Sequence, residues 1–427
     1  MSRTRILVAL SVGIFGFADV CALAQSTSGG GLSGGPPGAR SQRTKQRIRR
    51  VQAFNAFGPS DTHRFGDSLA DLPVDQLLRF ETGRALFEEV QTVDAGLGPN
   101  FSARSCTACH SAPVSAGASA GLVLRVGRRT FGTTEDSGGS EIGARDIEDV
   151  CTSPAEQREG LFAIRATTAI FGAGLIDAIS DETILAGADP NDLDGDGISG
   201  RAHIVADAYS GVDRVGRFGW KAQAATLESM TAESMEMHLG ITTRLSARRQ
   251  GPNDAAFSVV TDCDAVTDPE DAPDAAGVSD FERISNYLRL LAAPPRKQQN
   301  STLGLALFQR IGCSDCHTPV LYTQGNHNPA LSRRPVSLYS DLLLHDMGAS
   351  ADGIAQADAS GSEMRTAPLW GLRGRPALWH DGRFTAAETR IRDAINAHDG
   401  EGSQARELWN EMSASAKRAL VEFLNSI

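Results

Sequence analysis

Two short strings of cysteine and histidine carry the clearest chemistry in this 427-residue chain. Residues 106–110 and 313–317 both follow the pattern C-x-x-C-H. Cysteines three positions apart can form thioethers to both vinyl groups of one porphyrin, and the next histidine then lies under the iron. A zinc knuckle needs two clustered ligand pairs and a thioredoxin-like motif needs a surrounding βαβ pattern, and neither is present. We therefore expect two covalently bound haem c groups, held by Cys106, Cys109, His110, Cys313, Cys316 and His317.

The N-terminus has the pattern of a secretory signal over residues 1–24. Arg3 and Arg5 precede an apolar stretch, Ile6–Phe17, and Ala22-Leu23-Ala24 forms a small-x-small cleavage site. The apolar stretch is shorter than the roughly 20 residues of a spanning helix, which argues against a membrane anchor. We expect an exported, periplasmic protein with no stable membrane span.

The remaining cysteines fit an oxidising compartment. Once the signal and the haem motifs are set aside, Cys151 and Cys263 are left as a single pair. We predict that they form a disulfide, and two free buried thiols are the alternative. The pair lacks the C-x-x-C spacing of a reactive dithiol.

Charge and composition limit the partners. The net charge of −11 argues against nucleic-acid binding, although residues 40–50 are locally basic. This basic run follows the Gly- and Ser-rich residues 26–39, so we interpret residues 25–70 as a flexible leader.

Two segments of similar sequence precede the two haem motifs. Gly83–Phe87 reads GRALF and Gly304–Phe308 reads GLALF, with leucine and phenylalanine at helical spacing. Such repetition predicts two related helical domains, over residues 71–295 and 296–427, with the boundary at Pro294-Pro295. About 180 residues separate the first motif from this boundary, so we expect the first domain to be enlarged by insertions.

An acidic segment lies within the first predicted domain. Asp192, Asp194 and Asp196 alternate before a turn glycine, as the ligands of a calcium loop do. The twelfth position of such a loop is His203 rather than glutamate. A bound Ca²⁺ and a solvated turn are both kept as interpretations.

Several longer strings resemble the bacterial di-haem oxidoreductases that are related to di-haem cytochrome c peroxidase and MauG. The similarity runs from about residue 80 to the C-terminus, through GLGP (96–99), GLIDAI (174–179), DGDGISGR (194–201), FGWKA (218–222), LLHDMG (343–348) and HDGR (380–383). The resemblance implies a mainly α fold of two cytochrome c-like domains, one haem being the reaction site and the other an electron-transfer centre.

The resemblance also implies roles for single residues near the C-terminal haem. Trp220 occupies the position of a tryptophan that relays charge between the haems, although a plain core indole would pack equally well there. His398 lies at the helix end that carries the second axial ligand, which would make this haem bis-histidine. Met347 and Met364 are the competing ligands.

For the N-terminal haem, the resemblance leaves the sixth ligand open. No histidine follows His110 until His203, which suits an iron that peroxide can reach. The family's distal segment aligns with residues 227–242, where Met230 stands near a glutamine position. Glu233, Glu236 and His238 are the candidates for the acid-base group, and His238 could instead bind the iron or lie on the surface.

These features together predict a periplasmic di-haem peroxidase-like enzyme. H₂O₂ or a related oxidant would react at the N-terminal haem, and a small redox protein or another electron donor would supply electrons through the C-terminal haem. Two alternatives remain: a non-catalytic electron carrier, and a MauG-like enzyme that oxidises a partner protein. The label of thiol oxidoreductase, which some family members carry, gains little support from Cys151 and Cys263.

Overall fold

The computed structural model describes residues 63–98, 100–119, 121–128, 140–142, 145–146, 160–245, 266–297 and 301–427. All of them belong to one compact unit, Arg47–Ile427. The predicted signal, most of the predicted leader and the Cys151–Cys263 pair lie outside the described residues. The end of the leader is packed, because His63 is bonded to the carbonyl of Ala293 and the ring of Phe65 lies 5.3 Å from that of Phe171.

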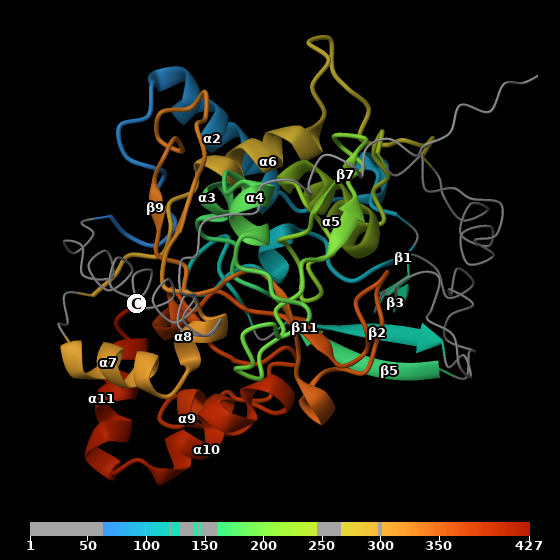
Figure 1. Ribbon diagram of the computed structural model, residues 1–427. Helices are drawn as coiled ribbons and strands as arrows, with labels where there is room; N and C mark the ends of the chain where they lie inside the picture. Colours follow the sequence, from blue (N-terminus) through green and yellow to red (C-terminus); the bar gives the residue numbers. More distant parts are fainter. Residues whose placement is uncertain are drawn as a thin grey trace, which may run out of the picture. The chain divides into compact units, whose positions relative to one another are not determined.

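A crossing of two helices lies beside the first haem motif. Helix α2 (Val74–Glu88) packs on α6 (Asp280–Leu290), and both are labelled in Figure 1. A Cβ added to Gly83 would lie 2.1 Å from the carbonyl oxygen of Arg283, so only glycine allows this approach. Next to it, the ring of Tyr287 contacts those of Phe80 and Phe87 at 5.0 and 5.4 Å.

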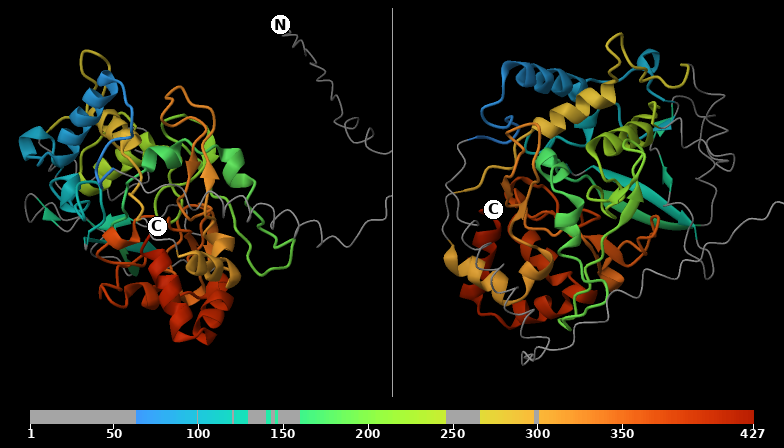
Figure 2. Two further views of the ribbon diagram at one scale, coloured as in Figure 1. Left: turned by 90° about the vertical axis from the view of Figure 1, so that its left-hand side faces the viewer. Right: turned by 45° about the horizontal axis from the view of Figure 1, so that its top comes forward.

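The second motif has a crossing of the same design. Helix α7 (Thr302–Arg310) packs on α11 (Ala414–Leu424), and Figure 2 shows this pair together from two further directions. A Cβ on Gly304 would lie 2.4 Å from the carbonyl oxygen of Ala419. The ring of Phe308 lies 5.6 Å from that of Phe423. The two GxALF segments therefore make equivalent local contacts.

The other helices and strands connect and cover these crossings. The helices are α3 (Ala173–Asp177), α4 (Asp181–Leu185), α5 (Leu227–Leu239), α8 (Cys313–Cys316), α9 (Arg390–Asn396) and α10 (Ser403–Glu411). Strand β2 (Leu122–Arg128) lies between β3 (Ser140–Ile142) and β5 (Gly160–Ala166) in an antiparallel sheet, with Leu122 opposite Ala166. The remaining strands form antiparallel pairs: β1 (Asn100–Phe101) with β4 (Arg145–Asp146), β6 (Ile204–Ala206) with β7 (Asp213–Val215), β8 (Leu321–Tyr322) with β9 (Pro335–Val336), and β10 (Leu344–Asp346) with β11 (Glu363–Arg365).

Helix is the larger class of regular structure in the described chain, as the sequence predicts, and the strands are short. One buried apolar cluster contains the α2–α6 crossing, and a second contains the α7–α11 crossing. Residues 336–343 and Trp370 belong to the first cluster although they follow the predicted domain boundary. The two halves of the chain therefore share part of a core. Among the described residues, no helix has the length and apolar character needed to span a bilayer.

Two turns, one in each half, have the same backbone form. Residues 218–224 and 378–384 are each closed by an isolated antiparallel bridge, Phe218 with Ala224 and Leu378 with Phe384. In both turns the second and fifth residues have positive φ: Gly219 and Ala222 in one, Trp379 and Gly382 in the other. Trp220 and His380 thus occupy equivalent positions, and their rings meet edge to face at 6.4 Å.

Candidate functional site

The first C-x-x-C-H string forms a short 3-10 helix, Cys106–Ala108. The hydroxyl of Ser105 caps it by accepting from the amide of Ala108, and the amide of His110 donates to the carbonyl of Cys106 at 2.9 Å. His110 Nδ1 lies 3.1 Å from the carbonyl oxygen of Gly117. Because the carbonyl can only accept, Nδ1 carries the hydrogen and Nε2 keeps its lone pair.

The second string forms helix α8 and repeats this arrangement. The amide of His317 donates to the carbonyl of Cys313 at 2.9 Å, and His317 Nδ1 lies 3.0 Å from the carbonyl oxygen of Tyr339. The rings of Phe87 and Phe308 lie 6.0 and 6.5 Å from the respective histidine rings. Both motif histidines therefore have the tautomer that a metal ligand needs.

Burial keeps these imidazoles neutral. It lowers the pKa of His110 to about 4, and a nearby His238 lowers it further against the hydrogen bond to Gly117. Burial also lowers the pKa of His317 to about 4, with His398 acting in the same direction. A neutral imidazole is the form that binds iron, so the donor set fits a haem at each motif.

The four motif cysteines are half-buried and form no disulfide with one another. Burial raises the pKa of Cys106 and of Cys313 to about 12, and it also raises the pKa of Cys316. Thiol chemistry requires the thiolate, which is scarce near neutral pH at such pKa values. The motif cysteines therefore lack the lowered pKa of a catalytic dithiol.

His398 lies directly opposite the second motif. It follows the end of α9, and its ring centroid lies 6.4 Å from that of His317, at an interplanar angle of 67°. His398 Nδ1 lies 2.8 Å from the carbonyl oxygen of Ala394, so it also keeps its lone pair on Nε2. Burial lowers its pKa.

The competing methionines lie in other surroundings. Met347 follows β10 and its amide donates to the carbonyl of Ser362. Met364 is buried in β11, where it pairs across the sheet with His345. The imidazole that faces His317 is that of His398.

Sequence reasoning assigned no role to His345, although its segment carried part of the resemblance. The buried imidazole lies between the carboxylates of Asp341 and Glu401, at 2.9 and 2.7 Å, and 3.5 Å from the sulfur of Cys316. Burial opposes its protonation, but the charge of Asp341 and the contacts with Cys316 raise its pKa well above the ordinary value. His345 is therefore a charged anchor beside the second motif, and it ties that motif to the loop after α9.

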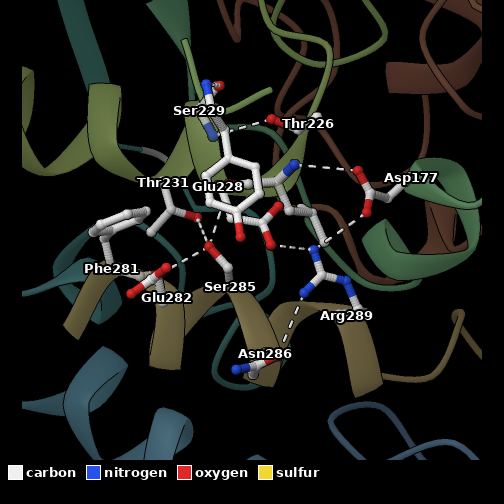
Figure 3. Close-up of polar contacts among 12 residues, drawn as sticks. Asp177, Thr226, Glu228, Ser229, Thr231, Phe281, Glu282, Ser285, Asn286 and Arg289 are labelled. Atoms are coloured by element: carbon white, nitrogen blue, oxygen red, sulfur yellow. Dashed lines mark hydrogen bonds and ion pairs between the residues drawn. The ribbon is translucent and has the colours of Figure 1, made fainter. Parts of the chain in front are cut away.

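Helix α5, the predicted distal segment, is fixed on α6 by a polar cluster (Figure 3). The hydroxyl of Ser285 donates to the carbonyl of Phe281 and lies 3.0 Å from that of Thr231. Arg289 donates to Glu228 at 2.7 Å and to Asp177 at 3.3 Å. These contacts set the position of α5 along α6.

The far end of α5 lies against the first haem motif. The carbonyl of His238 accepts from the amides of Ser102 and Ala103 at 2.9 and 3.1 Å, a few residues before Cys106. The effect of His238 on the pKa of His110 shows that the two side chains are near each other. The structure thus brings His238 to the N-terminal motif.

The other acid-base candidates face elsewhere. Glu233 and Glu236 line a pocket with Asp207, Gln223 and Ser229. Residues two apart in a helix point about 200° away from each other, so Glu236 and His238 lie on different faces of α5. Glu236 does not line the cavity that Cys106 lines.

That cavity holds acidic groups which sequence reasoning missed. Cys106 and Met235 line it together with Glu270, Asp271 and Asp280. Burial raises the pKa of Glu270 and of Asp271. Glu270 Oε2 accepts from the amide of Thr242 at 2.7 Å, while Oε1 is buried without a hydrogen-bond partner. Tertiary folding alone brings residue 270 here, so no local signal could have found it.

Trp220 lies between the two halves of the chain. Its indole N–H donates to the carbonyl of Ala166 at 2.9 Å, and its own carbonyl accepts from the amide of Arg365. The neighbouring Lys221 is fully buried, and its ammonium donates to the carbonyls of Ser360, Gly361 and Glu363 and pairs with Asp352. The turn that carries Trp220 is therefore held firmly against the C-terminal half.

The acidic segment forms a compact turn. Carboxylate oxygens of Asp189, Asp192 and Asp194 lie within 4.8 Å of one another, and Asp196 is not in this group. Asp192 accepts from the amides of Asp196 and Gly197, and Asp189 accepts from that of Leu193. Calcium binding stays a prediction.

A comparison with protein families decides the relationship of the chain. The family described as "Di-haem oxidoreductase, putative peroxidase" matches residues 141–427. The chain belongs to this di-haem oxidoreductase family. The match begins after the first C-x-x-C-H string and includes the second.

Solved structures give weaker likenesses. The chain is similar to hydrazine synthase from Kuenenia stuttgartiensis, with 13% identity and a TM-score of 0.37, over 87% of this chain and 98% of that one. It is also similar to a variant of the diheme peroxidase BthA from Burkholderia thailandensis, with 15% identity and a TM-score of 0.39, over 87% and 93%. No curated protein matches the sequence.

Proposed function

We propose that this di-haem oxidoreductase is an exported, peroxidase-like c-type enzyme. Cys106, Cys109 and His110 would hold one haem, and Cys313, Cys316, His317 and His398 the other. Bound haems would supply one-electron exchange at each iron and, at an iron with an open position, the two-electron reduction of H₂O₂ with two protons to two water molecules. A small redox protein or another donor would supply the electrons.

The spacing of His317 and His398 supports the second haem site. A metal–imidazole bond is about 2 Å long, so two imidazoles on one iron have ring centres about 6.3 Å apart. The observed separation is 6.4 Å. Both rings keep the lone pair on Nε2, and burial keeps both neutral.

The observation that carries the catalytic proposal is the difference between the two motif histidines. His317 faces a second neutral imidazole across a gap of the size an iron needs, whereas the histidine near His110 is His238, which is carried by helix α5. We assign electron storage to the saturated C-terminal site and reaction with the oxidant to the N-terminal site. Electrons would pass between them through Trp220.

His238 is our choice for moving the proton at the N-terminal site. Its helix end is bonded to the segment just before Cys106, and it lies near His110. An imidazole there could take a proton from one oxygen of H₂O₂ and deliver it to the other as the O–O bond breaks. Glu236 lies on another face of α5, so we assign this role to His238 instead.

The same proximity supports one other candidate function. If His238 binds the iron held by His110, both irons are six-coordinate and the protein is an electron carrier without catalysis. The position of α5 permits either role.

Spectroscopy of the mature holoprotein separates the two functions. We expect two haems per chain, one low-spin and one high-spin in electron paramagnetic resonance, with the high-spin signal changed by H₂O₂. The variant His238→Gln should retain both haems and lose most peroxide turnover, and replacement of the exposed His327 by glutamine serves as the control. An exclusively low-spin protein that peroxide leaves unchanged would eliminate the peroxidase proposal in favour of the carrier.

A further inference from the structure

A row of aromatic rings leads away from His398. The ring of Trp379 contacts that of His398 at 5.2 Å and 74°, and it contacts that of His380 at 6.0 Å. His380 in turn meets Trp220 at 6.4 Å and 80°. Trp379 thus joins the proposed ligand of the C-terminal haem to the predicted relay residue by way of one intervening ring.

Trp220 is connected on its other side to the N-terminal motif. Its indole N–H donates to the carbonyl of Ala166, and the hydroxyl of the next residue, Thr167, donates to the carbonyl of Gly121 at 3.1 Å. A Cβ on Gly121 would lie 3.3 Å from the sulfur of Cys109. These hydrogen bonds therefore lead from the indole of Trp220 to Gly121, whose backbone lies beside Cys109 of the first motif.

The backbone of Trp379 is in a conformation that a bulky residue rarely adopts. Its φ is +85°, and the equivalent residue of the other turn is Gly219, with φ of +78°. Glycine takes such angles freely, whereas a large side chain there is a strained outlier of the kind that clusters at functional sites. A tryptophan is thus retained at a position whose backbone suits glycine, with its ring against His398.

We propose that Trp379 is the first step of a two-tryptophan relay that carries electrons from the C-terminal haem site to Trp220 and on to the N-terminal site. This inference rests on the proposed function. In each transfer, Trp220 gives one electron toward the N-terminal site and is reduced by Trp379, which is reduced in turn from the C-terminal haem. Two transfers supply the two electrons that one H₂O₂ consumes.

The protons stay in place during these transfers. The indole N–H of Trp220 donates to the carbonyl of Ala166, and that of Trp379 donates to the carbonyl of Ser350 at 3.4 Å. A backbone carbonyl is not a base, so each oxidised indole keeps its hydrogen. The two protons needed by the oxidant come from water at the N-terminal site.

The test follows a single oxidation of the C-terminal haem. Holoprotein whose C-terminal haem has been reduced is mixed rapidly with one equivalent of H₂O₂ or of a peracid, and the absorbance of that haem reports its oxidation. We expect Trp379→Phe to slow this step at least tenfold, since about 1.4 kcal/mol of extra barrier has that effect and a phenyl ring is much harder to oxidise than an indole. Trp379→Tyr should recover part of the rate, because a phenol can be oxidised. Trp370→Phe, in the shared core, should leave the rate within twofold of wild type.

A purely structural role gives a different pattern. If Trp379 only positions His398, the phenylalanine and tyrosine variants should slow transfer equally, and the low-spin spectrum of the C-terminal haem should change in both. That pattern, or a wild-type rate in Trp379→Phe, would overturn the relay. Failure of the proposed function is separately visible: a wild type whose C-terminal haem is oxidised after addition of a peracid, but not after addition of H₂O₂, keeps the relay and loses the peroxidase assignment.

Discussion

Replacement of His398 tests the second haem site most directly. The ring of His398 stands 6.4 Å from that of His317, within about 0.1 Å of the spacing expected for two imidazoles on one iron. In the variant His398→Ala, the iron of the C-terminal haem should lose its sixth ligand, and its low-spin signal should become high-spin. In His398→Met, a thioether would replace imidazole, and the reduction potential should rise because thioether ligation favours the reduced iron.

The size of the expected rise in reduction potential follows from the exchange of imidazole for thioether. Axial ligands tune haem potentials over about 0.8 V in total, so we expect an increase on the order of 100 mV for this one exchange. For a one-electron couple, about 59 mV is a tenfold change, so this increase favours the reduced form about 50-fold. Spectroelectrochemical titration of the purified holoprotein measures it, and the N-terminal haem provides the internal reference.

The competing ligand supplies the control. His398 faces His317, while Met347 follows β10 and is bonded through its amide to Ser362, so Met347→Leu should leave both the spin state and the potential of the C-terminal haem unchanged. If the low-spin signal is instead lost in Met347→Leu and kept in His398→Ala, the bis-histidine assignment is wrong.

Three further predictions concern other parts of the molecule. A Cβ on Gly304 would lie 2.4 Å from a backbone carbonyl oxygen of α11, so Gly304→Ala should lower the free energy of unfolding by about 1–3 kcal/mol, as measured by denaturant titration of the holoprotein. Burial raises the pKa of Glu363, but the hydrogen bond from Arg201 and further contacts lower it to about 2. Its contribution to the free energy of unfolding should therefore be present above about pH 4.5 and be lost as pH falls towards 2. The variant Glu363→Gln should lack this pH-dependent contribution in acid unfolding, and an equal loss of stability with falling pH in both proteins would contradict the assignment. Burial raises the pKa of Glu270, which lines the cavity beside Cys106, so this carboxyl group can hold a proton there. Glu270→Gln should therefore lower peroxide turnover and change its pH dependence, and an unchanged pH–rate profile would leave Glu270 with a structural role only.

The repeated parts of this fold could be predicted because they depend on short-range sequence. Gly83 and Gly304 each precede a phenylalanine by four residues, and that spacing alone places both residues on one helix face. The structure adds that both glycines permit a close helix crossing. The His398 assignment relied on the resemblance, since no local pattern relates it to His317, 81 positions earlier in the chain.

Other features could not be read from the sequence for identifiable reasons. Glu236 and His238 both fall in the predicted distal segment, but the helical period places them on different faces, which a helical projection of residues 227–239 would have shown. Glu270 reaches the cavity beside Cys106 only through the tertiary fold. The charge of His345 could be inferred only after the structure had placed Asp341 and Glu401 beside it.

The two equivalent turns explain how a repeated unit can produce two unlike sites. The backbone of residues 218–224 matches that of 378–384, yet the side chains are exchanged: glycine then tryptophan in the first, tryptophan then histidine in the second. Trp220 therefore faces His380 across the boundary, and Trp379 is left free to turn toward His398. Had both turns kept glycine at the second position, the ring contact with His398 would be missing, and the aromatic row would end at His380. Tryptophan at one backbone-strained position thus extends the row to the proposed ligand of only one haem, so one repeated turn gives the two sites different aromatic surroundings.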